Sequence, residues 1–221
     1  MRVSAALDVR HAIPFKGGEL SSSGAHARLE VAVDRSVGAP VGALISDSYR
    51  DQNRTLHDLR PEYGGSSGKW VATVAHLVRS LNLASILDYG CGKGLLKQGL
   101  AGLPRVGTEA DLAGRVREYD PAIPGKDAAP APAELVVCTD VLEHVEPVYL
   151  DAVLDDLRRL TLNVAFLNIA TRPAEKTLPD GRNAHLIVEP SAWWLPKLKS
   201  RWTIASLQDF GDQFVVVGSK E

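Results

Sequence analysis

The stretch that decides the fold is Ser85-Ile86-Leu87-Asp88-Tyr89-Gly90-Cys91-Gly92-Lys93-Gly94-Leu95-Leu96. Its apolar start predicts a short buried strand, and the leucines at its end begin a helical pattern. Glycine adopts backbone angles that are closed to other residues, and it leaves the main chain open to a ligand. A strand that passes through a glycine turn into a helix is typical of ligand sites at the carboxyl ends of strands in open α/β sheets.

The spacing of the glycines bears on the kind of ligand. The dinucleotide-binding fingerprint is G-x-G-x-x-G, and its third glycine would fall at Leu95. The third glycine is Gly94 instead, so the stretch reads D-x-G-x-G-x-G from Asp88. For this loop alone, an ordinary strand-to-helix turn is the alternative interpretation.

The composition favours a globular protein of the cytoplasm. Of the 221 residues, 45% are hydrophobic and 24% are charged, and the net charge of -2 gives no reason to expect general nucleic-acid binding. No apolar run is long enough to cross a bilayer, and Asp8 and Arg10 interrupt any signal-peptide core near the start. The two cysteines, Cys91 and Cys138, fit a reducing compartment better than a disulfide scaffold.

Strand-like and helix-like patterns alternate from residue 68 to about residue 200. This alternation predicts an α/β fold with a doubly wound, mostly parallel sheet of seven strands and a C-terminal antiparallel hairpin. Six of the strands are expected near residues 86–88, 116–120, 134–139, 162–170, 202–207 and 213–217. We expect residues 46–221 to form this Rossmann-like domain. Residues 1–45 would be an N-terminal extension, partly irregular or an edge hairpin, with a strand-like alternation at residues 27–34.

A second motif follows the strand expected at residues 134–139. The string Leu135-Val136-Val137-Cys138-Thr139-Asp140-Val141-Leu142-Glu143-His144, together with the glycine loop, resembles the class I S-adenosylmethionine (SAM)-dependent methyltransferases. The resemblance covers roughly residues 68–218. It implies a methyltransferase fold with SAM as cofactor, and it leaves the methyl acceptor open.

The candidate cofactor-binding residues belong to the glycine loop and to the strand ends that follow it. In nucleotide-binding folds an acid about 20 residues past the loop accepts the ribose hydroxyls. Asp120, 26 residues after Gly94, is our candidate, with Glu109 and Glu118 as competitors. The resemblance also implies an acid near residue 127 for the adenine amine. The full candidate set is Asp88, Gly90, Cys91, Gly92, Gly94, Asp120, Asp127 and Asp140.

Asp140, Glu143 and His144 are spaced i, i+3 and i+4, so a helix would direct all three to one side. The cluster, with His185 in the next long loop, resembles the E-x-x-E-H motif of some ubiquinone-pathway O-methyltransferases and small-RNA 3′-end 2′-O-methyltransferases. That resemblance implies a divalent metal, Mg, Mn or Zn, although Asp140 is one methylene shorter than the usual glutamate. His185, His144 and Glu143 are the catalytic candidates, with His185 as an independent general base. The alternative is that no metal is bound, that Glu143 and His144 are residues at the start of a helix, and that His144 or His185 is a hydrogen-bonded packing group.

The sequence therefore predicts a SAM-dependent methyltransferase that acts on an oxygen or nitrogen of a small-molecule acceptor. Arg172 and Arg182 could bind a carboxylate or phosphate on that acceptor. Three alternatives stay open: a methyltransferase acting on RNA or DNA, a non-catalytic SAM-binding protein, and, disfavoured by Leu95, an NAD-dependent oxidoreductase.

Overall fold

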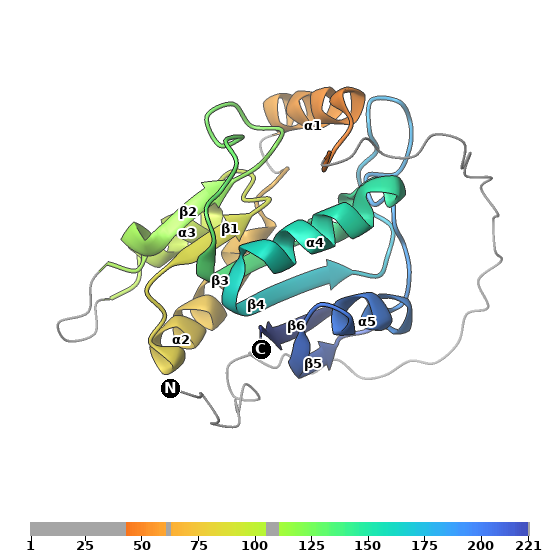
Figure 1. The fold of residues 1–221 in the computed structure, drawn as a ribbon. Coiled ribbons are helices and arrows are strands. Elements are labelled where there is room, and N and C mark those ends of the chain that lie inside the picture. The colour runs from red at the N-terminus through yellow and green to blue at the C-terminus, as the bar shows by residue number, and fades with distance from the viewer. Residues whose placement is uncertain (1–42, 61–62, 105–110, 221) are drawn as a thin grey trace.

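The computed structural model describes residues 43–60, 63–104 and 111–220. These residues contain a six-stranded sheet in the order β2-β1-β3-β4-β6-β5 (Figure 1). The strands are β1 (Ile86–Tyr89), β2 (Val116–Tyr119), β3 (Ala133–Thr139), β4 (Thr161–Ala170), β5 (Thr203–Asp209) and β6 (Gln213–Ser219). The first four are parallel, and β6 pairs antiparallel with both β4 and β5, which confirms the parallel sheet with a C-terminal hairpin.

The prediction of seven strands is wrong for the described part of the chain, which has six. The chain passes from β2 to β3 through a segment that contains Pro121, Pro124, Pro130 and Pro132. Proline donates no hydrogen bond to a ladder, so this segment does not add a strand at the β2 edge. The alternating residues 27–34 lie outside the described residues.

Helices cover both faces of the sheet. They are α1 (Asp47–Leu59), α2 (Val71–Leu81), α3 (Leu95–Ala101), α4 (Leu150–Leu160) and α5 (Ser191–Lys199), with short 3-10 turns at Ser66–Trp70, Ala113–Arg115, Leu142–His144 and Pro147–Tyr149. In β1, Ile86 packs with α2 and α3, whereas its neighbour Leu87 packs with α4 and α5. This alternation is the two-residue period of a strand buried on both sides. No helix in the described ranges is long and apolar enough to cross a membrane.

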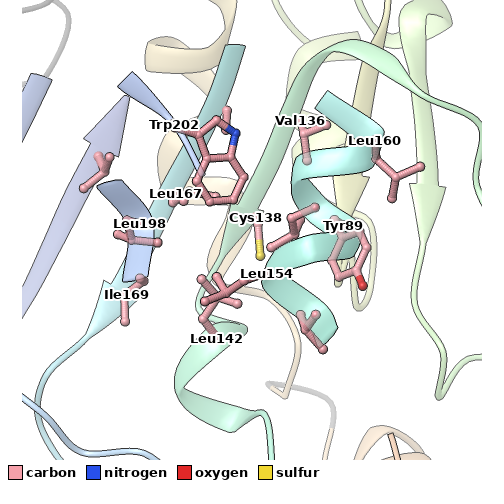
Figure 2. Packing of buried hydrophobic residues seen from close by; sticks show 14 of the residues in the cluster. Tyr89, Val136, Cys138, Leu142, Leu154, Leu160, Leu167, Ile169, Leu198 and Trp202 are labelled. Atoms are coloured by element: carbon pink, nitrogen blue, oxygen red, sulfur yellow. The ribbon is translucent and has the colours of Figure 1, made fainter. Parts of the chain in front are cut away.

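Helix α4 has the apolar spacing that predicted it from the sequence. Its buried residues recur at three- and four-residue intervals and form one stripe, Leu150, Val153, Leu154, Leu157 and Leu160. Figure 2 shows the cluster on this side of the sheet, in which Leu154 gathers with Cys138 and Leu167. The turn with Pro147 leads into the helix, where the missing N–H of proline costs nothing.

Helix α1 packs away from the sheet. It lies beside the loop that follows β4, residues 171–190, in the upper part of Figure 1. Its Tyr49 and Leu56 form a third apolar cluster with Tyr63 and Leu178. The helix therefore packs against the loop after β4 and against Tyr63, and this position brings its side chains to the site described next.

Candidate functional site

A cavity of about 610 Å³ lies where the carboxyl ends of β1 to β4 meet. Its walls come from the glycine turn, from the residues just after β2 and β3, from the loop after β4 and from α1. The lining residues used below are Gly90, Gly92, Asp120, Asp140, His144 and His185, with Tyr49, Asn53, His57, Tyr63, Lys93, Arg172 and Lys176. Ligands of open α/β sheets bind at this edge.

Gly90 and Gly92 let other segments pack directly against the turn. Both have left-handed backbone angles, with φ of 72° and 50°. A Cβ at Gly90 would overlap Val141, and one at Gly92 would overlap the backbone of Gly64. The glycines are therefore required by close protein packing as well as by the bend of the chain.

Gly94 makes room for a carboxylate, because a Cβ there would overlap the Glu118 side chain. The Lys126 ammonium donates to Glu118 Oε1 at 3.0 Å and to the Gly92 carbonyl at 3.1 Å. Burial opposes the charge of Lys126, but Glu118 outweighs it and raises the lysine pKa. Glu118, one of the two alternatives to Asp120 as the ribose-binding acid, thus faces Lys126. The other, Glu109, lies outside the described residues.

Asp120 is buried and lines the cavity. Its Oδ2 accepts from the Gly92 N–H at 3.1 Å, and its Oδ1 accepts from Ala122 N–H at 2.9 Å. A carboxylate has about four acceptor positions, so Asp120 can take further donors. Asp127, in contrast, is exposed and accepts from Gly125 N–H at 3.1 Å, outside the cavity lining.

Asp88 and Cys91 lie behind the turn, each 1% exposed. The Asp88 Oδ2 atom is buried without a hydrogen-bond partner. Burial, helped by the nearby Glu118 charge and opposed by Lys126, raises the Asp88 pKa to about 7. Burial also raises the pKa of the Cys91 thiol, which therefore stays protonated and unreactive.

The segment after β3 is not the helix on which the i, i+3, i+4 spacing relied. Asp140 has a left-handed φ of 60°, and only Leu142–His144 form a 3-10 turn. The reason is that the Asp140 N–H still donates to the Asn168 carbonyl of β4, at 3.0 Å, so the sheet continues for one more residue. Even so, Asp140, Glu143 and His185 are brought together, with one ligand atom from each within 4.8 Å of the others.

The pKa values of the two carboxyl groups are shifted in opposite directions. Glu143 is fully buried, and its Oε1 accepts from the Ala170 N–H at 2.8 Å while its Oε2 is buried without a partner. Burial raises the Glu143 pKa well above its ordinary value. Burial opposes ionisation of Asp140 too, but the Ser66 side chain and the Lys69 charge outweigh it and lower the Asp140 pKa.

Both imidazoles donate to carbonyl groups of the loop after β4. His144 Nδ1 lies 2.8 Å from the Ala184 oxygen, and His185 Nδ1 lies 2.6 Å from the Arg172 oxygen. A carbonyl only accepts, so Nδ1 carries the proton and Nε2 keeps a free lone pair. Burial, followed by the neighbouring His185, lowers the His144 pKa to about 4, and burial lowers the His185 pKa, so both rings are neutral at pH 7.

These groups fit a divalent metal ion. Two carboxyl groups and a histidine with a free Nε2 are suitable ligands, and the unpartnered Glu143 Oε2 lacks the donor that burial normally demands. The hydrogen bond from His185 Nδ1 to a backbone carbonyl is the arrangement that orients metal-binding histidines. His144 is not one of the three clustered residues.

Helix α1 supplies cavity residues that the sequence reasoning missed. Tyr49, Asn53 and His57 line the cavity at four-residue intervals, one side of the helix. The Tyr49 hydroxyl donates to the His144 carbonyl at 2.6 Å, and the Tyr63 hydroxyl donates to Asn53 Oδ1 at 2.8 Å. This polar spacing was present in the sequence, but only the tertiary structure shows that it faces a site.

Both ends of α1 are attached to the site. At its start, Ser46 donates through its N–H and its hydroxyl to the Glu146 carboxylate, at 2.9 and 2.8 Å. At its end, the Lys93 ammonium of the glycine turn donates to the carbonyl of Arg60, the C-cap, at 3.1 Å and to that of His57, in the last turn, at 3.3 Å. The helix is therefore joined to both halves of the cavity.

The two arginines considered for acceptor binding are placed differently. Arg172 lines the cavity and forms an exposed ion pair with Asp212, at 3.3 Å. Arg182 pairs with Asp180 at 2.7 Å and lies over the Tyr49 ring, outside the lining. Arg172 is thus the better placed of the two to meet an acceptor.

No family model and no curated protein matches this chain. Among solved structures, an O-methyltransferase family protein from Burkholderia thailandensis is 13% identical with a TM-score of 0.48, and the match covers 77% of this chain and 63% of that one. Magnesium protoporphyrin IX methyltransferase (ChlM) from Synechocystis PCC 6803 with bound SAH is 16% identical, with a TM-score of 0.49 and coverage of 79% and 95%. The DhpI–SAH complex is 17% identical, with a TM-score of 0.49 and coverage of 79% and 98%. The names of two of these three proteins contain the word methyltransferase.

Proposed function

We propose that this protein is a SAM-dependent methyltransferase that acts on an oxygen or nitrogen of a small-molecule acceptor. One observation carries the proposal: a single cavity is lined by the glycine turn with Asp120 and also by the acid and imidazole groups after β3 and β4. A volume of about 610 Å³ lies within the range of small-molecule sites, and α1 covers it.

The cofactor would lie along the glycine turn. The main chain of Gly90 and Gly92 and the remaining acceptor positions of Asp120 are available to it, the latter for the ribose hydroxyls. Asp88, Cys91 and Gly94 would hold the turn from behind, and Asp140 would close the other end. Asp127 remains a candidate for the adenine amine, beyond the lining residues Pro121 and Ala122.

When bound, SAM supplies an electrophilic methyl group on a sulfonium. The protein then has to align the acceptor atom with it, and such orientation supplies roughly 7–11 kcal/mol of a reaction barrier. For a hydroxyl acceptor, the free Nε2 of His185 or His144 can accept the proton, a contribution of about 10²–10⁴-fold.

A divalent metal ion, Mg, Mn or Zn, would be held by Asp140, Glu143 and His185, with His144 beside them. When bound, it would lower the pKa of an acceptor hydroxyl. Dialysis against a chelator, followed by re-addition of each metal, tests this part. We expect turnover to be lost and then restored, whereas undiminished turnover after chelation would rule out an essential ion.

The first test is calorimetric titration of S-adenosylhomocysteine and, separately, NAD. We expect binding of the first ligand only. Asp120→Ala should weaken it by about tenfold or more, because hydrogen bonds to a charged group contribute roughly 1.5–3 kcal/mol. Asp155→Asn, on the exposed side of α4, should bind like wild type. Binding of NAD alone would overturn the proposal.

The acceptor class needs a transfer assay. The protein is incubated with methyl-labelled SAM and either small-molecule extract fractions or mixed RNA and DNA. We expect label in a small molecule. Label only in nucleic acid would favour the nucleic-acid alternative, and cofactor binding without transfer to anything would favour a non-catalytic SAM-binding protein.

A further inference from the structure

We propose that Asn183 is a positioning residue that holds His144 and His185 in one orientation and one tautomer. The catalytic meaning of this inference rests on the proposed function, but the geometry does not. Asn183 lies in the loop after β4, two residues before His185, and does not line the cavity.

Its side chain makes three hydrogen bonds to the backbone of its own loop. Oδ1 accepts from the N–H groups of Ala174 and His185, each at 2.9 Å. Nδ2 donates to the Ala174 carbonyl at 2.8 Å. A backbone bridge between Thr177 and Asn183 closes the same loop. The amide therefore links Ala174 to the segment that carries His185, and it uses both its donor and its acceptor to do so.

The two carbonyls that receive the imidazole protons lie next to this tie. The Arg172 oxygen, which accepts from His185 Nδ1, is two residues before Ala174. The Ala184 oxygen, which accepts from His144 Nδ1, directly follows Asn183. Fixing the loop at Asn183 thus fixes both acceptors, and with them the protonated Nδ1 and free Nε2 of each ring.

NMR of the protein with ¹⁵N-labelled histidine tests this inference without knowledge of the methyl acceptor. Long-range ¹H–¹⁵N spectra would be recorded at a pH well above the imidazole pKa values, for wild type, Asn183→Ala, Asn183→Asp and Thr177→Ala. Thr177 is the matched control because it pairs with Asn183 through backbone only and its side chain is exposed.

In wild type we expect both rings as the single Nδ1-protonated tautomer. Asn183→Ala should give mixed tautomers for both, while S-adenosylhomocysteine affinity stays unchanged. Asn183→Asp keeps an acceptor oxygen but loses the Nδ2 donor, so its tautomer ratio should fall between those of wild type and Asn183→Ala. This variant provides the test if Asn183→Ala does not fold. Wild-type-like spectra for Asn183→Ala, or mixed tautomers in wild type, would overturn the inference.

The transfer assay separates this inference from the proposed function. With an acceptor identified, Asn183→Ala should lower kcat roughly 10- to 100-fold, with KM for SAM unchanged. Shifted tautomers in a protein that transfers no methyl group would leave Asn183 as the positioning residue and reject the enzyme.

Discussion

Asp88 is a single residue whose burial should destabilise the fold at neutral pH. Its pKa is raised from 3.8 to about 7, so the folded state binds a proton more tightly than the unfolded chain. The contribution of protonated Asp88 to the free energy of unfolding is fully present below pH 3.8 and is lost as the pH rises through about 7.

We therefore expect Asp88→Asn to raise the thermal midpoint at pH 8 and to have little effect near pH 4. A difference of about 3 pK units corresponds to an upper value on the order of 4 kcal/mol. Scans of both proteins without cofactor, across this pH range, measure it. Asp58→Asn, on the exposed side of α1, is the control, and a gain that does not grow with pH would contradict the argument.

Gly92 is required by its backbone angle and by its neighbour. Gly92→Ala places a Cβ against the Gly64 backbone at a φ of 50°, so we expect lower stability, with about 1–2 kcal/mol from the left-handed conformation alone. S-adenosylhomocysteine affinity should fall as well. Gly114→Ala, where nothing lies within 4 Å of the new Cβ, should change neither quantity. Equal effects of the two variants in melting and calorimetry would refute this interpretation.

At the scale of elements, α1 depends on its start. Ser46 is the N-cap, accepting from Tyr49 N–H at 3.1 Å, and it also donates to Glu146. Ser46→Ala should cost about 1 kcal/mol and speed hydrogen exchange of the α1 amides roughly fivefold. The sheet should exchange as before. Thr55→Ala, on the exposed side of the same helix, is the control, and uniform acceleration over the whole protein would argue against a local role.

At the scale of the whole molecule, the two faces of the sheet should unfold together. Leu77 lies in the cluster under α2 and α3, and Leu154 lies in the cluster under α4 and α5. Each leucine-to-alanine change should cost about 2–5 kcal/mol through lost packing and the cavity left behind. Because both clusters share the same strands, urea unfolding should show one transition in each variant. Two separate transitions would contradict a single cooperative unit.

Much of the fold was predictable because its signals are local. The short apolar run of β1, the apolar stripe of α4 and the glycine turn each lie within a dozen consecutive residues, so each could be recognised directly in the sequence. The number of strands was not predictable in this way. The proline-rich segment after β2 is compatible both with a simple connection to β3 and with a longer connection that includes another strand.

The candidate site was predictable only in its parts. Asp120, Asp140, Glu143, His144 and His185 were selected by their places after strands, and four of them line one cavity while Glu143 is buried beside it. Their directions were not predictable, because Asp140 leaves the sheet in a left-handed turn set by its bond to β4. The roles of all five remain proposals.

The sequence by itself determined the α/β alternation, the glycine turn and the chemical types of the candidate residues, because these depend on near neighbours in the chain. Only the tertiary structure decided that α1 covers the cavity, that Glu118 faces Lys126, and that Asn183 ties the loop that orients both histidines. These contacts form only when the loops are folded over the carboxyl ends of the strands. Local propensity carries no information about them.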